Sequence, residues 1–173
     1  MTTRKLTTLA MLTSIYVVLS ILTPIKVINF KFTLEAFPIL IAGLMMGPVE
    51  GLIVGFTGSA IYQLFFSSYG ITATTLLWIL PHAVNGLLAG LLGRTVKHLT
   101  TINVISIASI CAFTVTALNT LALYVDSKLF GYYSNKLVFG ALRIKIATGF
   151  ILAVIYALIL PKLITQLKKL LKK

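Results

Sequence analysis

Apolar segments of about twenty residues recur along the whole sequence, with only short links between them. A helix rises about 1.5 Å per residue, so roughly twenty apolar residues cross the ~30 Å hydrocarbon layer of a bilayer. The mean hydropathy is +1.03, and only 10% of the residues are charged, which leaves no stretch for a soluble catalytic domain. The sequence therefore predicts an all-α membrane protein with a single transmembrane domain, residues 1–173.

We expect about six transmembrane helices in a compact bundle. The predicted spans are 6–23, 34–47, 50–67, 75–95, 102–124 and 142–165. The basic and apolar start of the chain is similar to a signal peptide, but no small-residue cleavage site follows it. The first helix is therefore expected to be retained. Gly47 and Pro48 form the only separation between the second and third spans.

The distribution of Lys and Arg predicts that both termini are cytoplasmic. Nine of the 15 basic residues fall on that side: Arg4, Lys5, Arg94, Lys97, Lys162, Lys168, Lys169, Lys172 and Lys173. The basic residues behind the net charge of +12 lie mainly at the ends of apolar segments, where anionic lipids of the cytoplasmic leaflet attract them. We therefore expect contact with membrane lipid and no nucleic-acid partner.

Three longer connections, 23–37, 67–75 and 126–141, face outward in this topology. They are richer in aromatic and hydrogen-bonding side chains than the short inward turn at Gly47, so recognition chemistry is expected outside. Within the first connection, "KVINFKF" (26–32) alternates apolar and polar residues as a short strand or an extended lid does. A solvated linker is the alternative interpretation.

Polar residues interrupt the fourth predicted span. Trp78, His82, Asn85 and Ala89 follow a 4-3-4 spacing, which places them on one helical face, and Pro81 lies beside them. Polar groups within hydrocarbon cost several kcal/mol unless they face protein or water. This face is expected to be a pocket wall, and the alternative is that His82 and Asn85 only hydrogen-bond to another helix. The opposite face carries Leu76, Leu80, Leu87 and Leu91.

The three acidic residues, Glu35, Glu50 and Asp126, are placed near the ends of predicted spans, so no intramembrane carboxylate is expected beside His82. There is no Walker-type loop and no Ser-His-Asp or paired-carboxylate pattern. The lone Cys111 lacks metal-ligand spacing and is expected to pack as a small apolar residue. The sequence therefore predicts no enzyme, no catalytic residue, no metal and no cofactor bound by this chain.

Pairs of small residues four positions apart occur in three predicted helices. They are Ala10 with Ser14, Gly51 with Gly55, and Gly86 with Gly90. Such pairs let helix backbones approach closely in lipid, either for internal packing or for docking to a partner protein. The basic tail from Pro161 onward is expected to anchor the inner side, with a docking peptide as the alternative.

Four stretches together resemble the membrane-embedded S components of energy-coupling factor (ECF) vitamin transporters. They are "LAMLTSIYVVLS" (9–20), "FPILIAGLMMGPVEGLIVGF" (37–56), "NTLALYV" (119–125) and "LRIKIATGFILAVIYALILPKL" (142–163). Within that family the chain is most similar to the folate group, through its helical hairpin and through Asn119 and Thr120 followed by Arg143. Where folate members have Leu-Arg-Gly, this chain has Val84, Asn85 and Gly86.

The resemblance implies an outward pocket that captures a vitamin with high affinity, folate first, with cobalamin or another large heterocycle as the alternative. It also implies a complex with a transmembrane coupling protein and two ATPases that use ATP, in the plasma membrane of a bacterium. Ala10 and Ser14 correspond to the family's docking motif.

The expected substrate-binding residues combine ring stacking with hydrogen bonding. They are Tyr69, Thr74, Trp78, His82, Asn85, Asn119, Tyr132 and Arg143. The competing interpretation is a small autonomous channel or facilitator, which needs no energy source. A channel requires a continuous polar path, whereas the inner half of this sequence offers glycines and leucines.

Overall fold

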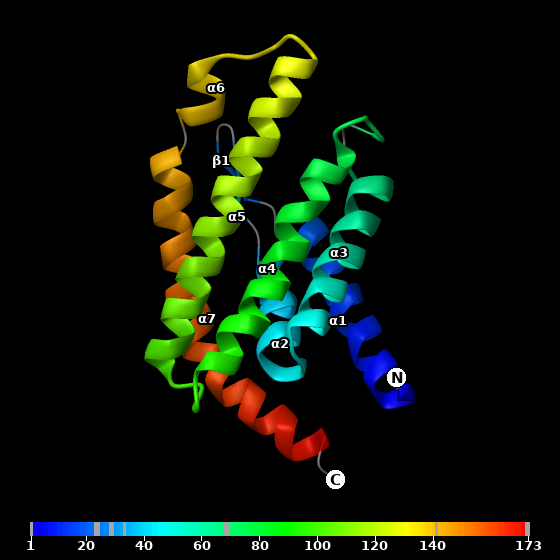
Figure 1. Ribbon diagram of the computed structural model, residues 1–173, viewed down its shortest axis with the longest axis vertical. Helices are drawn as coiled ribbons and strands as arrows, with labels where there is room; N and C mark the ends of the chain where they lie inside the picture. Colours follow the sequence, from blue (N-terminus) through cyan, green and yellow to red (C-terminus); the bar gives the residue numbers. More distant parts are fainter. Residues whose placement is uncertain are drawn as a thin grey trace.

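The computed structural model describes residues 2–22, 25–27, 30–32, 34–67, 70–140 and 142–171. The helices are α1 (Thr3–Leu22), α2 (Ala36–Met46), α3 (Pro48–Phe65), α4 (Thr75–Thr95), α5 (Thr101–Leu129), α6 (Asn135–Phe139) and α7 (Leu142–Leu171). The strands are β1 (Ile25–Val27) and β2 (Phe30–Phe32). The long helices run along the long axis of the molecule, and the start of α1 and the end of α7 lie at the same end of it (Figure 1).

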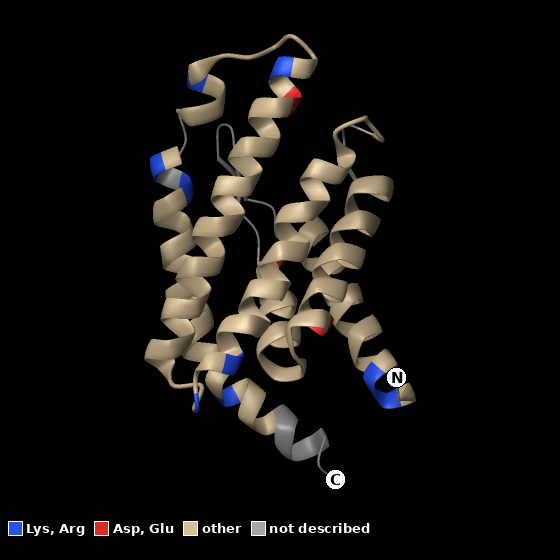
Figure 2. Ribbon diagram, in the orientation of Figure 1, with Lys and Arg blue, Asp and Glu red and all other residues tan. Residues whose placement is uncertain are grey.

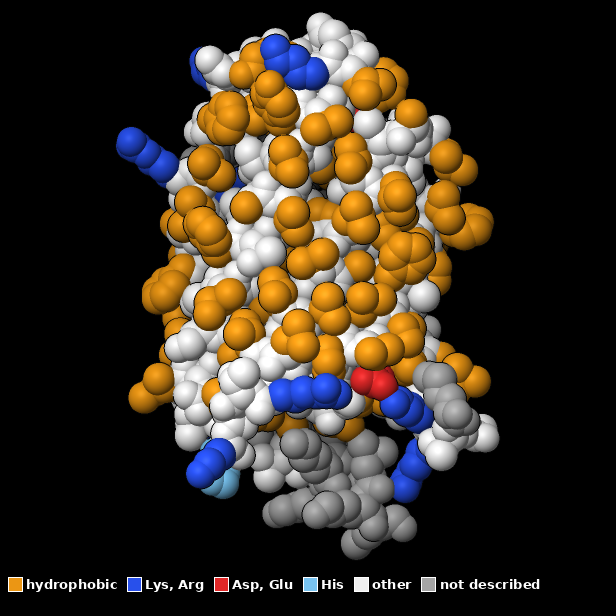
Figure 3. All heavy atoms as spheres, in the orientation of Figure 1, with side chains coloured by type: hydrophobic (Ala, Val, Ile, Leu, Met, Phe, Trp, Pro, Cys, Tyr) orange, Lys and Arg blue, Asp and Glu red, His pale blue; other side chains and the backbone are white. Residues whose placement is uncertain are grey.

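The predicted helical-bundle class is confirmed, and four segments of the described part of the chain are long and apolar enough to cross a membrane. These are α1, α4, α5 and residues Lys145–Gln166 of α7. Apolar side chains cover the middle of the surface shown in Figure 3, and Lys and Arg lie toward the two ends of the molecule in Figures 2 and 3. This distribution is typical of a protein whose middle section is surrounded by lipid.

Three elements differ from the expected spans, and one of them is α3, which is not among the four segments above. The helix found in the second span, α2, has 11 residues and a length of only about 16 Å, too short to cross a bilayer alone. The connection after α5 is shorter than expected because α5 continues to Leu129, and α6 forms within the remaining loop.

A tight turn joins α2 to α3. Gly47 has a φ of 126°, a conformation that side chains with a Cβ rarely adopt, and its N–H donates to the carbonyls of Ala42 (3.2 Å) and Gly43 (3.1 Å). Pro48 begins α3, where the missing N–H costs no helical hydrogen bond. The Gly-Pro pair therefore ends one helix and starts the next without a loop.

Glycine pairs bring α3 and α4 into backbone contact. A Cβ added to Gly86 would lie 2.0 Å from the carbonyl oxygen of Gly51, and one added to Gly55 would lie 2.1 Å from that of His82. The glycine pairs of these helices thus serve internal packing. The small pair on α1 differs, because Ala10 and Ser14 are both exposed, with the Ser14 hydroxyl donating to the Ala10 carbonyl at 2.9 Å.

An antiparallel hairpin connects α1 to α2. Ile25 pairs with Phe32, Lys26 with Lys31, and Val27 with Phe30, so the strand interpretation of this alternating segment is confirmed. The hairpin lies in the half of the molecule that holds α6 and the α3–α4 connection, away from the start of α1 (Figure 1).

Candidate functional site

The face of α4 that carries the 4-3-4 pattern points into the protein. Asn85 is 2% exposed, and Trp78 and His82 are only partly exposed. On the other side of the helix Leu76 and Leu80 are 56% and 42% exposed. The amphipathic prediction for this helix therefore agrees with the structure, and its polar residues are available to an internal site.

A group of four polar side chains in contact with one another lies in the interior of the bundle, and we call it the Glu35 network: Tyr16, Ser20, Glu35 and His82. The Ser20 hydroxyl donates to Glu35 Oε2 at 2.9 Å. His82 Nε2 lies 3.8 Å from Glu35 Oε1, which makes an ion pair when the imidazole is protonated. The rings of Tyr16 and His82 pack edge to face, with their centroids 5.6 Å apart.

The Glu35 network is largely withdrawn from the surface. Tyr16 and Ser20 are at most 1% exposed, and the side chains of Glu35 and His82 are 17% and 12% exposed. Gly58 on α3 makes room for the Tyr16 ring, since a Cβ there would lie 2.6 Å from it. A carboxylate buried to this extent requires polar partners. The network therefore either holds the helices together or forms part of a binding site.

The position of Glu35 corrects the sequence-based expectation that no intramembrane carboxylate accompanies His82. Glu35 directly precedes α2, and that helix of 11 residues puts it about 16 Å from the turn at Gly47. The carboxylate thus lies within the bundle beside His82. One signal in the sequence was missed: Tyr16 and Ser20 are four residues apart and share a face of an otherwise apolar helix.

Two further polar groups border the Glu35 network. Tyr156 on α7 is 4% exposed, and its ring lies 5.8 Å from that of Phe37, which follows Glu35 by two residues. Asn85 lies one helical turn beyond His82. Among the residues that the structure describes, neither the Tyr156 hydroxyl nor Asn85 Oδ1 has a hydrogen-bond partner. Sequence reasoning singled out Asn85 but not Tyr156.

A second polar group lies at the N-terminal end of α4. The hydroxyls of Thr74 and Tyr132 both donate to the carboxylate of Asp126, one to each oxygen. This ties the start of α4 to the turn after α5. Thr74 lies eight residues from His82 along α4, about 12 Å, so this group and the Glu35 network occupy different levels of the bundle.

The remaining predicted residues lie apart from the Glu35 network. Asn119 is partly buried on α5, and Arg143 is exposed at the start of α7, about 20 Å along the helix from Tyr156. Tyr69 lies outside the described residues. The structure thus brings Trp78, His82 and Asn85 to one interior wall. It brings Thr74 and Tyr132 together around Asp126, and it leaves Arg143 at the surface.

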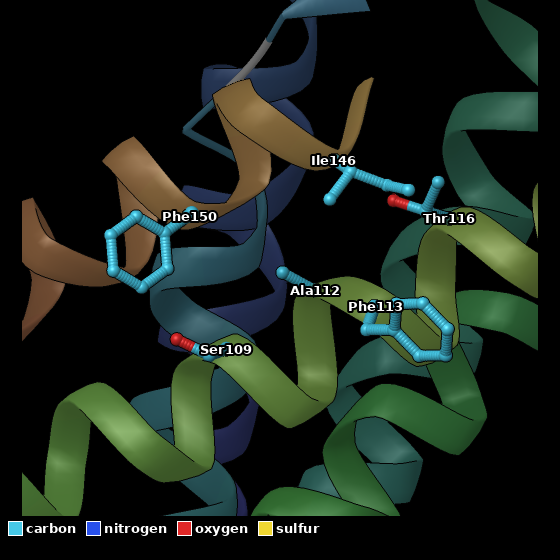
Figure 4. Close-up of a pocket in the computed structure, with 6 residues that line it drawn as sticks. All are labelled: Ser109, Ala112, Phe113, Thr116, Ile146 and Phe150. Atoms are coloured by element: carbon cyan, nitrogen blue, oxygen red, sulfur yellow. The ribbon is translucent and has the colours of Figure 1, made fainter. Parts of the chain in front are cut away.

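The cavity shown in Figure 4 lies between α5 and α7 and has a volume of about 220 Å³. Its lining residues are Ser109, Ala112, Phe113, Thr116, Ile146 and Phe150. Phe113 and Phe150 are 63% and 56% exposed, so the cavity opens toward the apolar surface that faces lipid. None of the predicted site residues lines it, and it is not the candidate site.

Metal binding finds no support in the described part of the chain, where no group of three or more His, Cys, Asp or Glu side chains could hold an ion. The arrangement offers hydrogen-bond acceptors, hydroxyls and aromatic rings inside an apolar bundle. These features suit the binding of a flat polar molecule.

Membrane-spanning helices around a buried polar network define the chain as a multi-pass membrane protein with an internal candidate site. The model of the family described as ECF-type riboflavin transporter, S component, matches residues 1–169. The chain belongs to this family of transporter subunits, which is not a class of enzymes. Among curated proteins, none matches the sequence.

Solved structures of S components share the fold. FolT bound with folic acid has a TM-score of 0.70 and 21% identity, with 92% of each chain covered. The S component of a bacterial ECF transporter has a TM-score of 0.67 and 23% identity over 98% of each chain. The S component for biotin from an ECF-type ABC transporter has a TM-score of 0.65 and 19% identity over 94% of each chain.

Proposed function

We propose that this chain is the vitamin-capturing subunit of an ECF-type importer. It takes up a vitamin from outside and delivers it through a complex with a transmembrane coupling protein and two ATPases, which use ATP. Membership of the family supports this role, and the observation that carries it is the Glu35 network with Asn85 and Tyr156 beside it. A buried polar group of this kind in an apolar bundle is a functional site by default.

The proposed orientation places the start of α1 and the end of α7 in the cytoplasm of a bacterium. Arg4, Lys5 and Arg94 belong to that end of the bundle, and the hairpin and α6 belong to the other. The excess of basic residues on the first side supports the assignment. The vitamin then enters from the end that carries the hairpin.

The identity of the vitamin stays a proposal. The sequence resemblance predicts folate, and the structure of FolT bound with folic acid shares the fold. The description of the matched family favours riboflavin instead. Arg143, on which the folate expectation partly rests, is exposed and far from the Glu35 network. We therefore place riboflavin beside folate as the first ligands to test, with cobalamin as the alternative.

The proposed docking surface lies on α1. Ala10 and Ser14 are exposed there, flanked by Leu6 and Met11, which are 59% and 61% exposed. Small side chains let a partner helix approach closely, and apolar neighbours extend the contact. The glycine pairs on α3 and α4 are unavailable to a partner because they already pack against each other.

The test is to titrate the purified chain alone with riboflavin, folate and cobalamin, and to follow the fluorescence of Trp78. Trp78 is the sole tryptophan and lies one turn from His82, so quenching reports on the interior wall. Equilibrium dialysis provides a second readout for coloured ligands. Submicromolar binding of one vitamin is expected. Failure to bind any vitamin contradicts the proposal, and flux through the isolated chain in liposomes without ATP favours a channel.

A further inference from the structure

The cavity between α5 and α7 follows the two helices on the side of the bundle that faces lipid. Thr116 and Ile146 line one end of it, and Ser109 and Phe150 line the other (Figure 4). Ser109 and Thr116 are seven residues apart on α5, which corresponds to about 10 Å along the helix. The cavity therefore spans about two helical turns.

The level of this cavity in the membrane follows from α7. Residues Lys145–Gln166 are the part of that helix that is apolar enough to cross a bilayer, and its 22 residues extend over about 33 Å. Lys145 therefore marks one edge of the hydrocarbon layer. Because Ile146 follows it directly, the cavity occupies roughly the first 10 Å of hydrocarbon next to that edge. The first carbons of lipid acyl chains lie at this level.

Two basic residues lie where the cavity meets the edge of the hydrocarbon layer. Arg143, Ile146 and Phe150 are spaced three and four residues apart, so they share one face of α7. Lys145 lies one turn from Gly149, where α7 packs closely against the α5 wall of the cavity. Arg143 is exposed, Lys145 is partly buried, and Figure 2 shows basic residues at this start of α7. A negatively charged group at this end of the cavity is attracted by both side chains.

The size and polarity of the cavity select its occupant. A volume of about 220 Å³ is too small for a helix, which is about 10–12 Å wide with its side chains. Phe113 and Phe150 flank the opening and present apolar surface, which favours hydrocarbon. The hydroxyl of Thr116, at the end near Ile146, is a donor for an ester carbonyl. Cations at the edge, a hydroxyl below them and apolar walls beyond match a phospholipid from its phosphate to its acyl chain.

We propose that the cavity between α5 and α7 binds one acyl chain of an anionic phospholipid, with the phosphate beside Arg143 and Lys145. The site is separate from the Glu35 network, and the proposal does not depend on which vitamin the chain binds. A lipid that binds the folded chain and not the unfolded one stabilises the bundle.

The first experiment measures the lipid retained by the purified wild-type chain, by native mass spectrometry from detergent. Phosphatidylglycerol and phosphatidylcholine with identical acyl chains are added separately at equal concentration. We expect one phosphatidylglycerol to be retained at least about tenfold more than phosphatidylcholine, because two basic residues attract its net negative charge. Glycerol phosphate, which has no acyl chain, should not displace it. Equal retention of the two lipids, or displacement by glycerol phosphate, overturns the proposal.

The second experiment changes the two halves of the site separately. The double variant Arg143→Gln, Lys145→Gln removes the charges, and Ser109→Leu fills the cavity. Each is expected to lower the retention of phosphatidylglycerol at least about tenfold. Lys136→Gln on α6 is the control for charge, and Ala117→Leu, at an exposed position of α5 that does not line the cavity, is the control for size. Wild-type retention in the double variant or in Ser109→Leu overturns the proposal, as does an equal loss in both controls.

Thermal unfolding in detergent gives an independent readout. Phosphatidylglycerol should raise the unfolding temperature of the wild-type chain more than phosphatidylcholine does. The Ser109→Leu chain should respond to neither lipid, because leucine occupies the space of the acyl chain. Thr116→Leu fills the opposite end of the cavity and replaces Ser109→Leu if that variant does not fold. A rise equal to that of wild type in the filled variant contradicts the proposed site.

Discussion

His82 on α4 lies with its Nε2 3.8 Å from Oε1 of Glu35, although α2 and α3 separate the two residues in the sequence. The Ser20 hydroxyl, on α1, donates a hydrogen bond to the other carboxylate oxygen. One carboxylate thus connects three parts of the bundle. The same contact puts a carboxylate inside a bundle whose core is mainly apolar.

Replacing Glu35 with Gln tests whether this carboxylate contributes to binding. The change keeps the size of the side chain but removes its charge and one acceptor, and hydrogen bonds to charged groups are the stronger ones. We expect the affinity of the isolated chain for its vitamin to fall at least tenfold, measured by equilibrium dialysis.

Glu50→Gln is the matched control for this change. Glu50 is also largely buried, but it pairs with Lys5 at the end of the bundle that holds the start of α1. Its substitution should leave the affinity unchanged. Equal affinities for both variants and wild type would assign Glu35 a purely structural role.

Gly86→Ala is expected to destabilise the protein strongly. The added Cβ would lie 2.0 Å from the carbonyl oxygen of Gly51, and neither backbone can yield without moving a helix. Overpacking of this kind costs about 1–3 kcal/mol or more. Gly93→Ala serves as the control, because its nearest neighbour is the flexible end of Leu44 at 3.0 Å. Equal unfolding temperatures of the two variants in detergent would show that the contact is not rigid.

Substituting Ala10 or Ser14 with Trp tests the proposed docking surface. A large side chain on an exposed helix face blocks close approach of a partner helix but leaves the interior intact. Co-purification with the coupling protein and vitamin uptake are expected to be lost, while the isolated chain binds its vitamin as before. Leu121→Trp, at a 57% exposed position on α5, should preserve both. Loss of complex in all three variants would point to a general folding defect.

Tyr132→Phe distinguishes the two roles open to Tyr132. Its hydroxyl donates to Asp126, so the substitution should lower the free energy of unfolding by about 1.5–3 kcal/mol. Because the ring remains, affinity for the vitamin should change less than threefold. Tyr133→Phe, whose hydroxyl bonds the exposed Asn135, is the comparison with a smaller expected effect on unfolding. A large loss of affinity in Tyr132→Phe alone would assign its hydroxyl to binding.

The sequence predicted features that depend on local pattern. The spacing of His82 and Asn85 placed them on an interior face, and the Gly47–Pro48 pair predicted the tight turn. Alternation over 26–32 gave a strand as one of its interpretations, and this is the one that the structure shows. Each of these three features follows from the periodicity of helices and strands or from backbone conformation. None of them depends on how segments distant in the sequence pack together.

Features that depend on depth and on tertiary contact were not predictable. Glu35 fell at the edge of a predicted span. That span, 34–47, is itself too short to cross a bilayer, but its length alone does not show which of its ends lies within the bundle. Tyr156 is a single tyrosine within a long apolar helix, where the sequence does not distinguish it from its neighbours. Its position beside Phe37 depends on the packing of α7 against α2. The hydrogen bonds from Thr74 and Tyr132 to the Asp126 carboxylate likewise join segments that lie far apart in the sequence.

The backbone contact between Gly51 and Gly86 also limits how this protein can change shape. Two helices that touch through their main chains, with carbonyl oxygens seated against α-carbons, cannot slide or twist past each other without a steric clash. The third and fourth helices therefore travel as one rigid pair, and His82 and Asn85 are carried on it. A rearrangement of the bundle that moves this pair must therefore occur where it meets the first, second or fifth helix.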